Sequence, residues 1–188
     1  MFIQTEDTPN PATLKFLPGC EVLAGEGANF ADAASANDSP LATRLFAVEG
    51  VDNVFLGSDF ISVTSSTEWK FVKPLILGAI MEHFRSGDPA LLEQASAKRG
   101  HDAHEGGESN GSDGETITAI KQLLDERVRP VVARDGGDIV FSRFEQGVVY
   151  LHMRGACAGC PSATMTLQQG IENLLRHYIP EVTEVRPA

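Results

Sequence analysis

The chain has 188 residues, of which 42% are hydrophobic and 22% charged, a composition typical of soluble globular proteins and sufficient for two small domains. Its formal net charge of −11 excludes the basic footprint of a nucleic-acid-binding protein, and its apolar runs are too short to span a membrane. Three cysteines, two of them in one Cys-x-x-Cys, exclude a secreted disulfide framework.

The first half of the chain mixes strand and helix signals and predicts a small α+β domain over residues 1–95. Ser39 before Pro40 predicts the start of a short helix, because serine is a favoured N-cap and proline suits the first helical position. A longer helix over residues 70–84 follows from apolar residues at helical spacing. The predicted strands are residues 2–6, 13–16, 51–56 and 60–64. We find no catalytic constellation among these elements.

Residues 96–114 predict a flexible linker between two domains. This stretch contains five glycines and no aromatic or branched apolar side chain, so it buries too little surface to offset the entropy of ordering. As a glycine-rich coil it spans on average about 25 Å, which lets the flanking domains move nearly independently.

The second half of the chain, residues 115–188, predicts a domain with the element order α-β-β-α-β. Its first helix covers residues 115–133, and we expect Pro130 to kink or end the last turn. A hairpin turns at residues 145–147, a second helix follows Cys160 and ends before Pro180, and a short strand comes last. The fold class is therefore α+β in both halves.

The most informative motif is the pair Cys157 and Cys160, in a loop that leaves a strand and enters a helix. Pro161 suits the first helical position, which places the two sulfurs near the positive, amide-rich end of that helix. This setting favours thiolate over thiol, and the small residues Ala158 and Gly159 leave room beside the sulfurs. The motif predicts an exposed, ionised pair of soft metal ligands.

Three interpretations of this pair compete. A dithiol–disulfide redox protein uses a Cys-x-x-Cys at a helix start, but thioredoxin-like folds place it early in the chain, not after a hairpin near its end. A zinc-bridged dimeric adaptor needs four thiolates, as does an iron–sulfur cluster, and one chain supplies two. Cys20 is expected to be a thiol that binds no metal, because no other donor lies near it in sequence.

The motif belongs to a longer segment with a recognisable pattern. The sequences DGGD (residues 135–138), LHMRGACAGCPS (151–162) and LQQGIE (167–172) closely resemble the C-terminal domain of NifU, found in the Nfu-type iron–sulfur cluster carriers. Upstream, TPNPATLKF (8–16), followed by Pro18 and Gly19, is similar to the Nfu N-terminal domain. The resemblance covers both ends of the chain and leaves out the linker.

The resemblance implies a specific function. Such proteins hold one [4Fe–4S] cluster between the loops of two protomers, so Cys157 and Cys160 are expected to be the cofactor and metal ligands of a homodimer. The cluster comes from upstream assembly proteins and passes to apo iron–sulfur proteins. Residues 1–95, which carry 13 acidic and 5 basic side chains, are expected to recognise these clients through their acidic surface. No covalent catalysis is needed, so we do not expect an enzyme.

The start of the chain predicts the compartment. It has neither a basic segment nor an apolar stretch, and acidic residues appear by position 6. Together with the reduced cysteines, this predicts a cytoplasmic protein rather than one carrying a transit segment.

Overall fold

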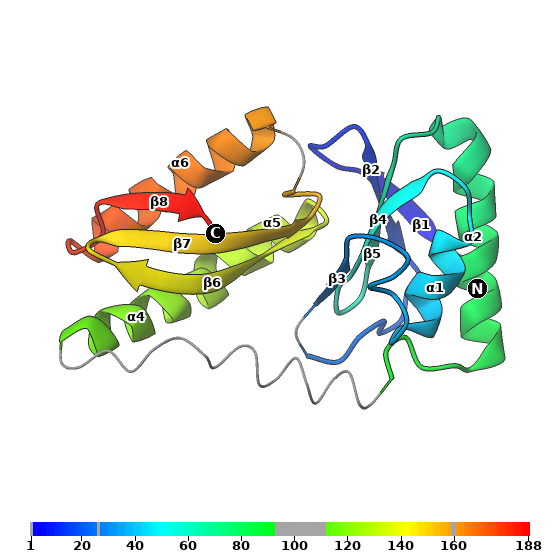
Figure 1. Ribbon diagram of the computed structural model, residues 1–188, viewed down its shortest axis with the longest axis horizontal. Helices are drawn as coiled ribbons and strands as arrows, with labels where there is room; N and C mark the ends of the chain where they lie inside the picture. The colour runs from blue at the N-terminus through cyan, green and yellow to red at the C-terminus, as the bar shows by residue number, and fades with distance from the viewer. Residues whose placement is uncertain (1, 26, 93–111, 159–160) are drawn as a thin grey trace.

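Figure 1 shows a computed structural model that describes residues 2–25, 27–92, 112–158 and 161–188, with the backbone alone at 112–113 and 161–163. The chain forms two sheets, and each has its own hydrophobic core. Helices pack with each sheet, so both halves of the chain are α+β, as the sequence predicts. We call residues 2–92 the N-terminal unit and residues 112–188 the C-terminal unit. Within the described residues, no helix is long and apolar enough to cross a membrane.

The N-terminal unit is a five-stranded antiparallel sheet in the order β1-β2-β5-β4-β3, with two helices on one face (Figure 1). Its elements are β1 (Gln4–Asp7), β2 (Thr13–Leu17), β3 (Ala28–Phe30), α1 (Pro40–Phe46), β4 (Val51–Leu56), β5 (Ile61–Ser65) and α2 (Trp69–Ser86). Alternate residues of each strand point to opposite faces, so Leu14, Phe16 and Val63 join the core under the helices.

The predicted start of helix α1 is confirmed. Ser39 is its N-cap and accepts a hydrogen bond from the Ala42 amide at 3.1 Å, and Pro40 is its first residue. Strand β3 was not predicted, because three residues are too few for an alternating pattern to stand out. It pairs with β4 and completes the sheet edge.

The C-terminal unit has the predicted order α-β-β-α-β around a three-stranded sheet, β6-β7-β8. Its elements are α4 (Ser112–Leu123), η1 (Leu124–Val128), α5 (Arg129–Arg134), β6 (Gly137–Glu145), β7 (Val148–Gly155), α6 (Pro161–Tyr178) and β8 (Glu184–Pro187). Strands β6 and β7 form an antiparallel hairpin, and β8 returns after α6 to pair in parallel with β7. Helix α4 starts at Ser112, three residues before the predicted start at residue 115.

Pro130 does not end the first helix of this unit. Residues 124–128 form a π-helical turn directly before it, and the helix then continues as α5 to Arg134. A proline ring clashes with the carbonyl four residues earlier and provides no amide, and a wider turn absorbs both defects. The expected disturbance therefore lies before the proline, and the helix axis continues past it.

Two side chains of α6 form hydrogen bonds with the backbone of the last strand, β8. Gln168 Nε2 donates to the Val185 carbonyl, and Glu172 Oε2 accepts from the Val185 amide at 3.2 Å. Val185 is fully buried in the core of this unit. Helix α6 and strand β8 therefore move as one body, with the cysteine motif at the start of that helix.

Candidate functional site

The cysteine motif lies at the end of the β6–β7 hairpin, beside the turn that precedes β6. We call residues 135–137 the glycine turn and residues 155–158 the thiol loop. Gly137 pairs with Gly155 across the hairpin, and the Ala156 amide donates to the Gly136 carbonyl at 3.1 Å. Gly136 and Gly155 have φ values of +79° and +62°, which explains why glycine occupies both positions. The two segments therefore form one rigid pair.

The Cys157 side chain packs directly on Gly137. Its exposed fraction is 8%, and it belongs to the hydrophobic core of the C-terminal unit. A Cβ atom placed on Gly137 would lie 2.2 Å from the Cys157 sulfur, far inside van der Waals contact. The Cys157 sulfur therefore fits only because residue 137 has no side chain. This packing explains the glycine at that position without a role in phosphate binding.

The environment of Cys157 corrects one expectation from the sequence. Burial, with a smaller contribution from the charges of Asp135 and Asp138, raises the pKa of the Cys157 thiol to about 12. We expected an exposed thiolate at a helix start, and the structure instead places the Cys157 side chain in the core, where burial favours the neutral thiol. The positive end of α6 is outweighed because the side chain turns into the core, where desolvation penalises the charged form.

Cys160, the second predicted ligand, lies outside the described residues. Helix α6 begins at Pro161, as predicted from the position of that proline. Thr164, in the first turn of α6, donates from Oγ1 to the Cys157 carbonyl at 3.1 Å and so ties the helix to the thiol loop. Sequence reasoning missed this contact, although a threonine in the first turn of a helix is a common signal of a local side-chain bond. Among the described residues no cluster of three or more histidine, cysteine or acidic side chains has a metal-binding arrangement.

An ion pair supports the glycine turn from behind. Arg129 donates from Nε to Asp138 Oδ1 at 2.9 Å and from Nη2 to Oδ2 at 3.1 Å, while Nη1 reaches Asp125 Oδ1 at 3.1 Å. Burial alone lowers the pKa of Arg129, but these two carboxylates more than compensate and raise it above its ordinary value. Asp138 is buried beside Gly137, so the fork of Arg129 fixes the start of β6. The sequence analysis did not identify Arg129.

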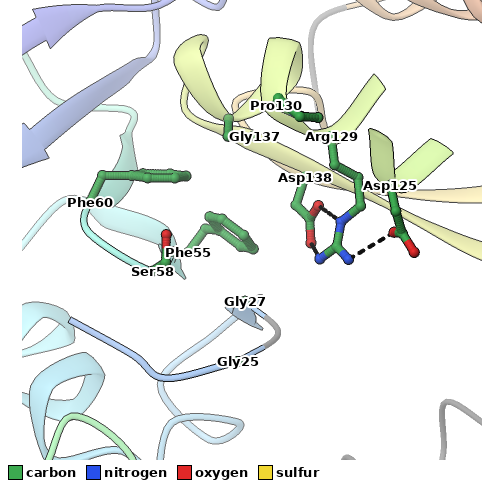
Figure 2. A pocket seen from close by; sticks show the side chains of 12 residues that line it. Gly25, Gly27, Phe55, Ser58, Phe60, Asp125, Arg129, Pro130, Gly137 and Asp138 are labelled. Atoms are coloured by element: carbon green, nitrogen blue, oxygen red, sulfur yellow. Dashed lines mark hydrogen bonds and ion pairs between the residues drawn. The ribbon is translucent and has the colours of Figure 1, made fainter. Parts of the chain in front are cut away.

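A cleft of about 290 Å³ lies between the two units, next to this ion pair (Figure 2). Phe55 and Phe60 line it from the N-terminal unit, and Arg129 and Pro130 from the C-terminal unit. The Arg129 guanidinium is already paired with Asp138 and Asp125, so it provides no free positive charge to the cleft, whose walls are formed partly by aromatic rings.

Two remaining candidates, Arg154 and Cys20, contact or belong to the N-terminal unit. Arg154 donates from Nη1 to the Gly27 carbonyl at 3.4 Å. Cys20 is exposed and lines a hollow together with Phe2 and Asp59 at the far edge of the N-terminal unit.

Comparison with known proteins gives two family matches and many relatives. Residues 120–186 match the family model described as a NifU-like domain, and residues 3–87 match the model of the scaffold protein Nfu/NifU N terminal. Proteins named "NFU1 iron-sulfur cluster scaffold homolog, mitochondrial" from Drosophila willistoni and Drosophila persimilis are 50% and 51% identical over 98% of this chain. The chain spans 63% and 64% of the length of these two relatives. The solution structure of a NifU-like protein from Saccharomyces cerevisiae shares 23% identity, with a TM-score of 0.45, and the match covers 50% of this chain and 86% of that one.

These names correct the predicted compartment. The relatives are mitochondrial proteins, whereas the sequence led us to expect a cytoplasmic one. That prediction depended on the first residues of the chain. Because the relatives are longer, the first residues of this chain are no guide to its compartment.

Proposed function

Because this chain belongs to the family that joins an Nfu/NifU N-terminal domain to a NifU-like domain, we propose that it carries an iron–sulfur cluster and delivers it to apo-proteins. The observation that supports this role is the packing of Cys157, the first cysteine of the motif, on Gly137 at the end of the β6–β7 hairpin. Cys157 and Cys160 are the proposed ligands, and the cluster is cargo that the protein receives from assembly proteins and gives away.

The number of sulfur donors supports a shared site. Each chain offers the two thiols of the motif, while a [4Fe–4S] cluster takes four. Two chains related by a twofold axis supply that number, with one cluster per homodimer. Cluster loading requires the Cys157 side chain to leave Gly137 and lose its proton, so the cluster-free chain keeps this ligand protected inside the C-terminal core.

The burial of Cys157 also weighs against a dithiol redox protein. The attacking species in thiol–disulfide exchange is the thiolate, and a buried thiol with a raised pKa is a poor nucleophile. We therefore keep carriage as the proposed function and use redox activity as an outcome of the test.

Anaerobic reconstitution with iron and sulfide tests the proposal. The expected product is a brown dimer with about four irons per two chains, measured by iron analysis and light scattering. The Cys157→Ser Cys160→Ser double variant should lose the iron and stay smaller, whereas Cys20→Ser should load normally. A single chain holding a complete cluster contradicts the shared site. Catalytic reduction of insulin by the iron-free protein would favour the redox interpretation.

We further propose that the N-terminal unit recognises client proteins through its acidic surface. Exposed carboxylates such as Asp32, Asp38 and Glu49 give it much of its net charge. Changing these three to amides in the full chain should slow cluster transfer to an apo-ferredoxin without changing cluster content. The control makes three amide replacements at exposed acids of the C-terminal unit, Glu126, Glu145 and Glu181. Equal transfer rates for both variants would remove this role.

A further inference from the structure

The centre of the outer face of the N-terminal sheet, opposite its helices, is buried although no described helix of its own unit covers it. Side chains at alternate positions of β2, β4 and β5 point there, and we call Lys15, Phe55 and Ser62 the outer-face residues. Their exposed fractions are 6%, 1% and 1%. Phe55 lies outside the core cluster beneath α1 and α2. Figure 1 shows the C-terminal unit on this side of the sheet.

The outer face binds the glycine turn and the last residue of α5 through their backbone carbonyls. Ser62 Oγ donates to the Gly136 carbonyl at 2.6 Å, and Lys15 Nζ donates to the Arg134 carbonyl at 3.0 Å. Lys15 also pairs with Glu6 Oε2 at 3.3 Å, so its buried charge is balanced within its own sheet. A Cβ on Gly136 would lie 2.7 Å from Ser62 Oγ, which shows how closely the Ser62 side chain approaches the backbone of the glycine turn.

The same face reaches the thiol loop. Asn10 Nδ2 donates to the Ala158 carbonyl at 3.3 Å, and Asn29 Oδ1 accepts from the Gly155 amide at 3.4 Å. A Cβ on Gly155 would lie 3.1 Å from the Phe55 ring, so the ring lies against the backbone of the loop. The contacts are concentrated on the residues that flank Cys157.

The chemistry of this interface suits reversible association. Its hydrogen bonds join side chains of one unit to backbone groups of the other, and water can replace each of them when the units part. Lys15 keeps its partner Glu6 after separation, so no charge is left buried and unpaired. The charged network of Arg129 lies within the C-terminal unit and is not broken either.

From these contacts we propose that the outer face of the N-terminal sheet is a docking surface for the thiol loop of its own chain, and that a second chain gains access to the loop only after this surface releases it. The second half rests on the proposed function. The docked chain is then a closed, cluster-free form, because the side of the loop that Phe55 and Asn10 cover cannot at the same time face a partner's loop. Cluster sharing competes with docking for one surface.

The test weakens docking without touching the thiol loop. Ser62→Glu places a carboxylate against the Gly136 carbonyl in the docked form, and water solvates it when the units separate. Gln4→Glu is the matched control, because it adds the same charge at an exposed position of the outer face, two residues before Glu6. Both variants are made in the full chain, and circular dichroism checks that the N-terminal sheet is intact.

The first measurement uses iron-free protein. Hydrogen exchange at the Gly155 amide, which donates to Asn29 across the interface, should become about tenfold or more faster in Ser62→Glu and stay unchanged in Gln4→Glu, since exchange follows the population of the open form. Unchanged protection in a folded Ser62→Glu variant overturns the docking surface, whatever the protein carries.

The second measurement uses protein reconstituted with iron and sulfide. The protein concentration at which half the chains form the cluster-bridged dimer should fall about tenfold or more in Ser62→Glu. The reason is that the apparent dissociation constant equals the intrinsic constant divided by the fraction of undocked chains, and the variant raises that fraction. Faster exchange without this shift overturns the competition and leaves the docking surface standing. Faster exchange with no cluster bound by wild type or variant leaves the docking surface standing and rejects the proposed function instead.

Discussion

Replacing Gly137 with alanine should displace the Cys157 side chain from its position in the core. The added Cβ would lie 2.2 Å from the sulfur, while ordinary contacts between such atoms are about 3.5–4.0 Å. The sulfur must therefore move by more than an ångström. Two further atoms, the Arg154 carbonyl oxygen and the Cys157 amide nitrogen, would lie 3.0 Å from the new methyl group and belong to the backbone of the hairpin end.

The expected loss of stability follows from this overpacking. Forcing a methyl group into a filled core costs about 1–3 kcal/mol, and we expect the C-terminal unit to lose that amount. The same substitution at Gly170 is the matched control, because it lies inside α6 and its Cβ would meet nothing within 4 Å. There alanine should stabilise the unit by about 0.5–1 kcal/mol, since it favours the helix over the unfolded chain.

Urea unfolding with separate probes resolves the two units. Trp69 is the only tryptophan and lies in the N-terminal unit, while Tyr150 and Tyr178, the two tyrosines, lie in the C-terminal unit. In a Trp69→Phe background, tyrosine emission follows the C-terminal unit alone. We expect the midpoint to fall for Gly137→Ala and to rise slightly for Gly170→Ala at unchanged m-values.

A double-mutant cycle decides whether the sulfur is the cause. In a Cys157→Ala background the clash with Sγ is gone, so Gly137→Ala should cost less by about 0.5–3 kcal/mol than in the wild type. Alkylation of Cys157 in the single variant should also become faster, because the side chain has left the core. If Gly137→Ala is neutral, or if the cycle shows no coupling, the packing of the thiol on this glycine is wrong.

Three further predictions concern stability. Burial and the charge of Arg44, opposed by Asp88, lower the pKa of His83 below 6.5, so at low pH the unfolded chain binds a proton that the folded chain does not. The N-terminal unit should therefore lose stability as the pH falls from about 7, and His83→Gln should make its stability, measured in urea titrations, depend less on pH. Arg129→Ala should cost about 1–3 kcal/mol, because it leaves the buried carboxylate of its partner unsatisfied; Asp125→Ala, at a side chain 62% exposed, should cost less than about 1 kcal/mol, and comparable losses would contradict the assignment. Ser39→Ala should lower the melting temperature through loss of about 1 kcal/mol of capping, and an unchanged melting temperature would show that the cap bond is unimportant.

The sequence predicted the elements that have strong periodic or capping signals. Helix α1 with its Ser39 cap, the two hairpins and the order of the C-terminal unit all follow from local patterns. These features are local, so the neighbouring residues contain the information that determines them.

The features that the sequence did not predict depend on contacts between distant segments. The direction of the Cys157 side chain is set by Gly137, twenty residues earlier, and no helix-start argument contains that contact. The burial of Lys15 and Phe55 on an outer sheet face depends on the other unit. Alternation predicts which face a residue occupies, but not whether a second sheet covers that face.

The grip of Gln168 and Glu172 on the backbone of Val185 has a practical consequence for protein engineering. Removing residues 184–188 would expose one edge of the central strand β7 and free two polar side chains on the helix that starts beside the thiols. Trimming this tail for crystallisation, or fusing a rigid tag directly to it, would therefore disturb the end of the molecule that contains Cys157. Labels and tethers belong on the β6–β7 turn at residues 146–147, at the opposite end of the hairpin from the cysteines.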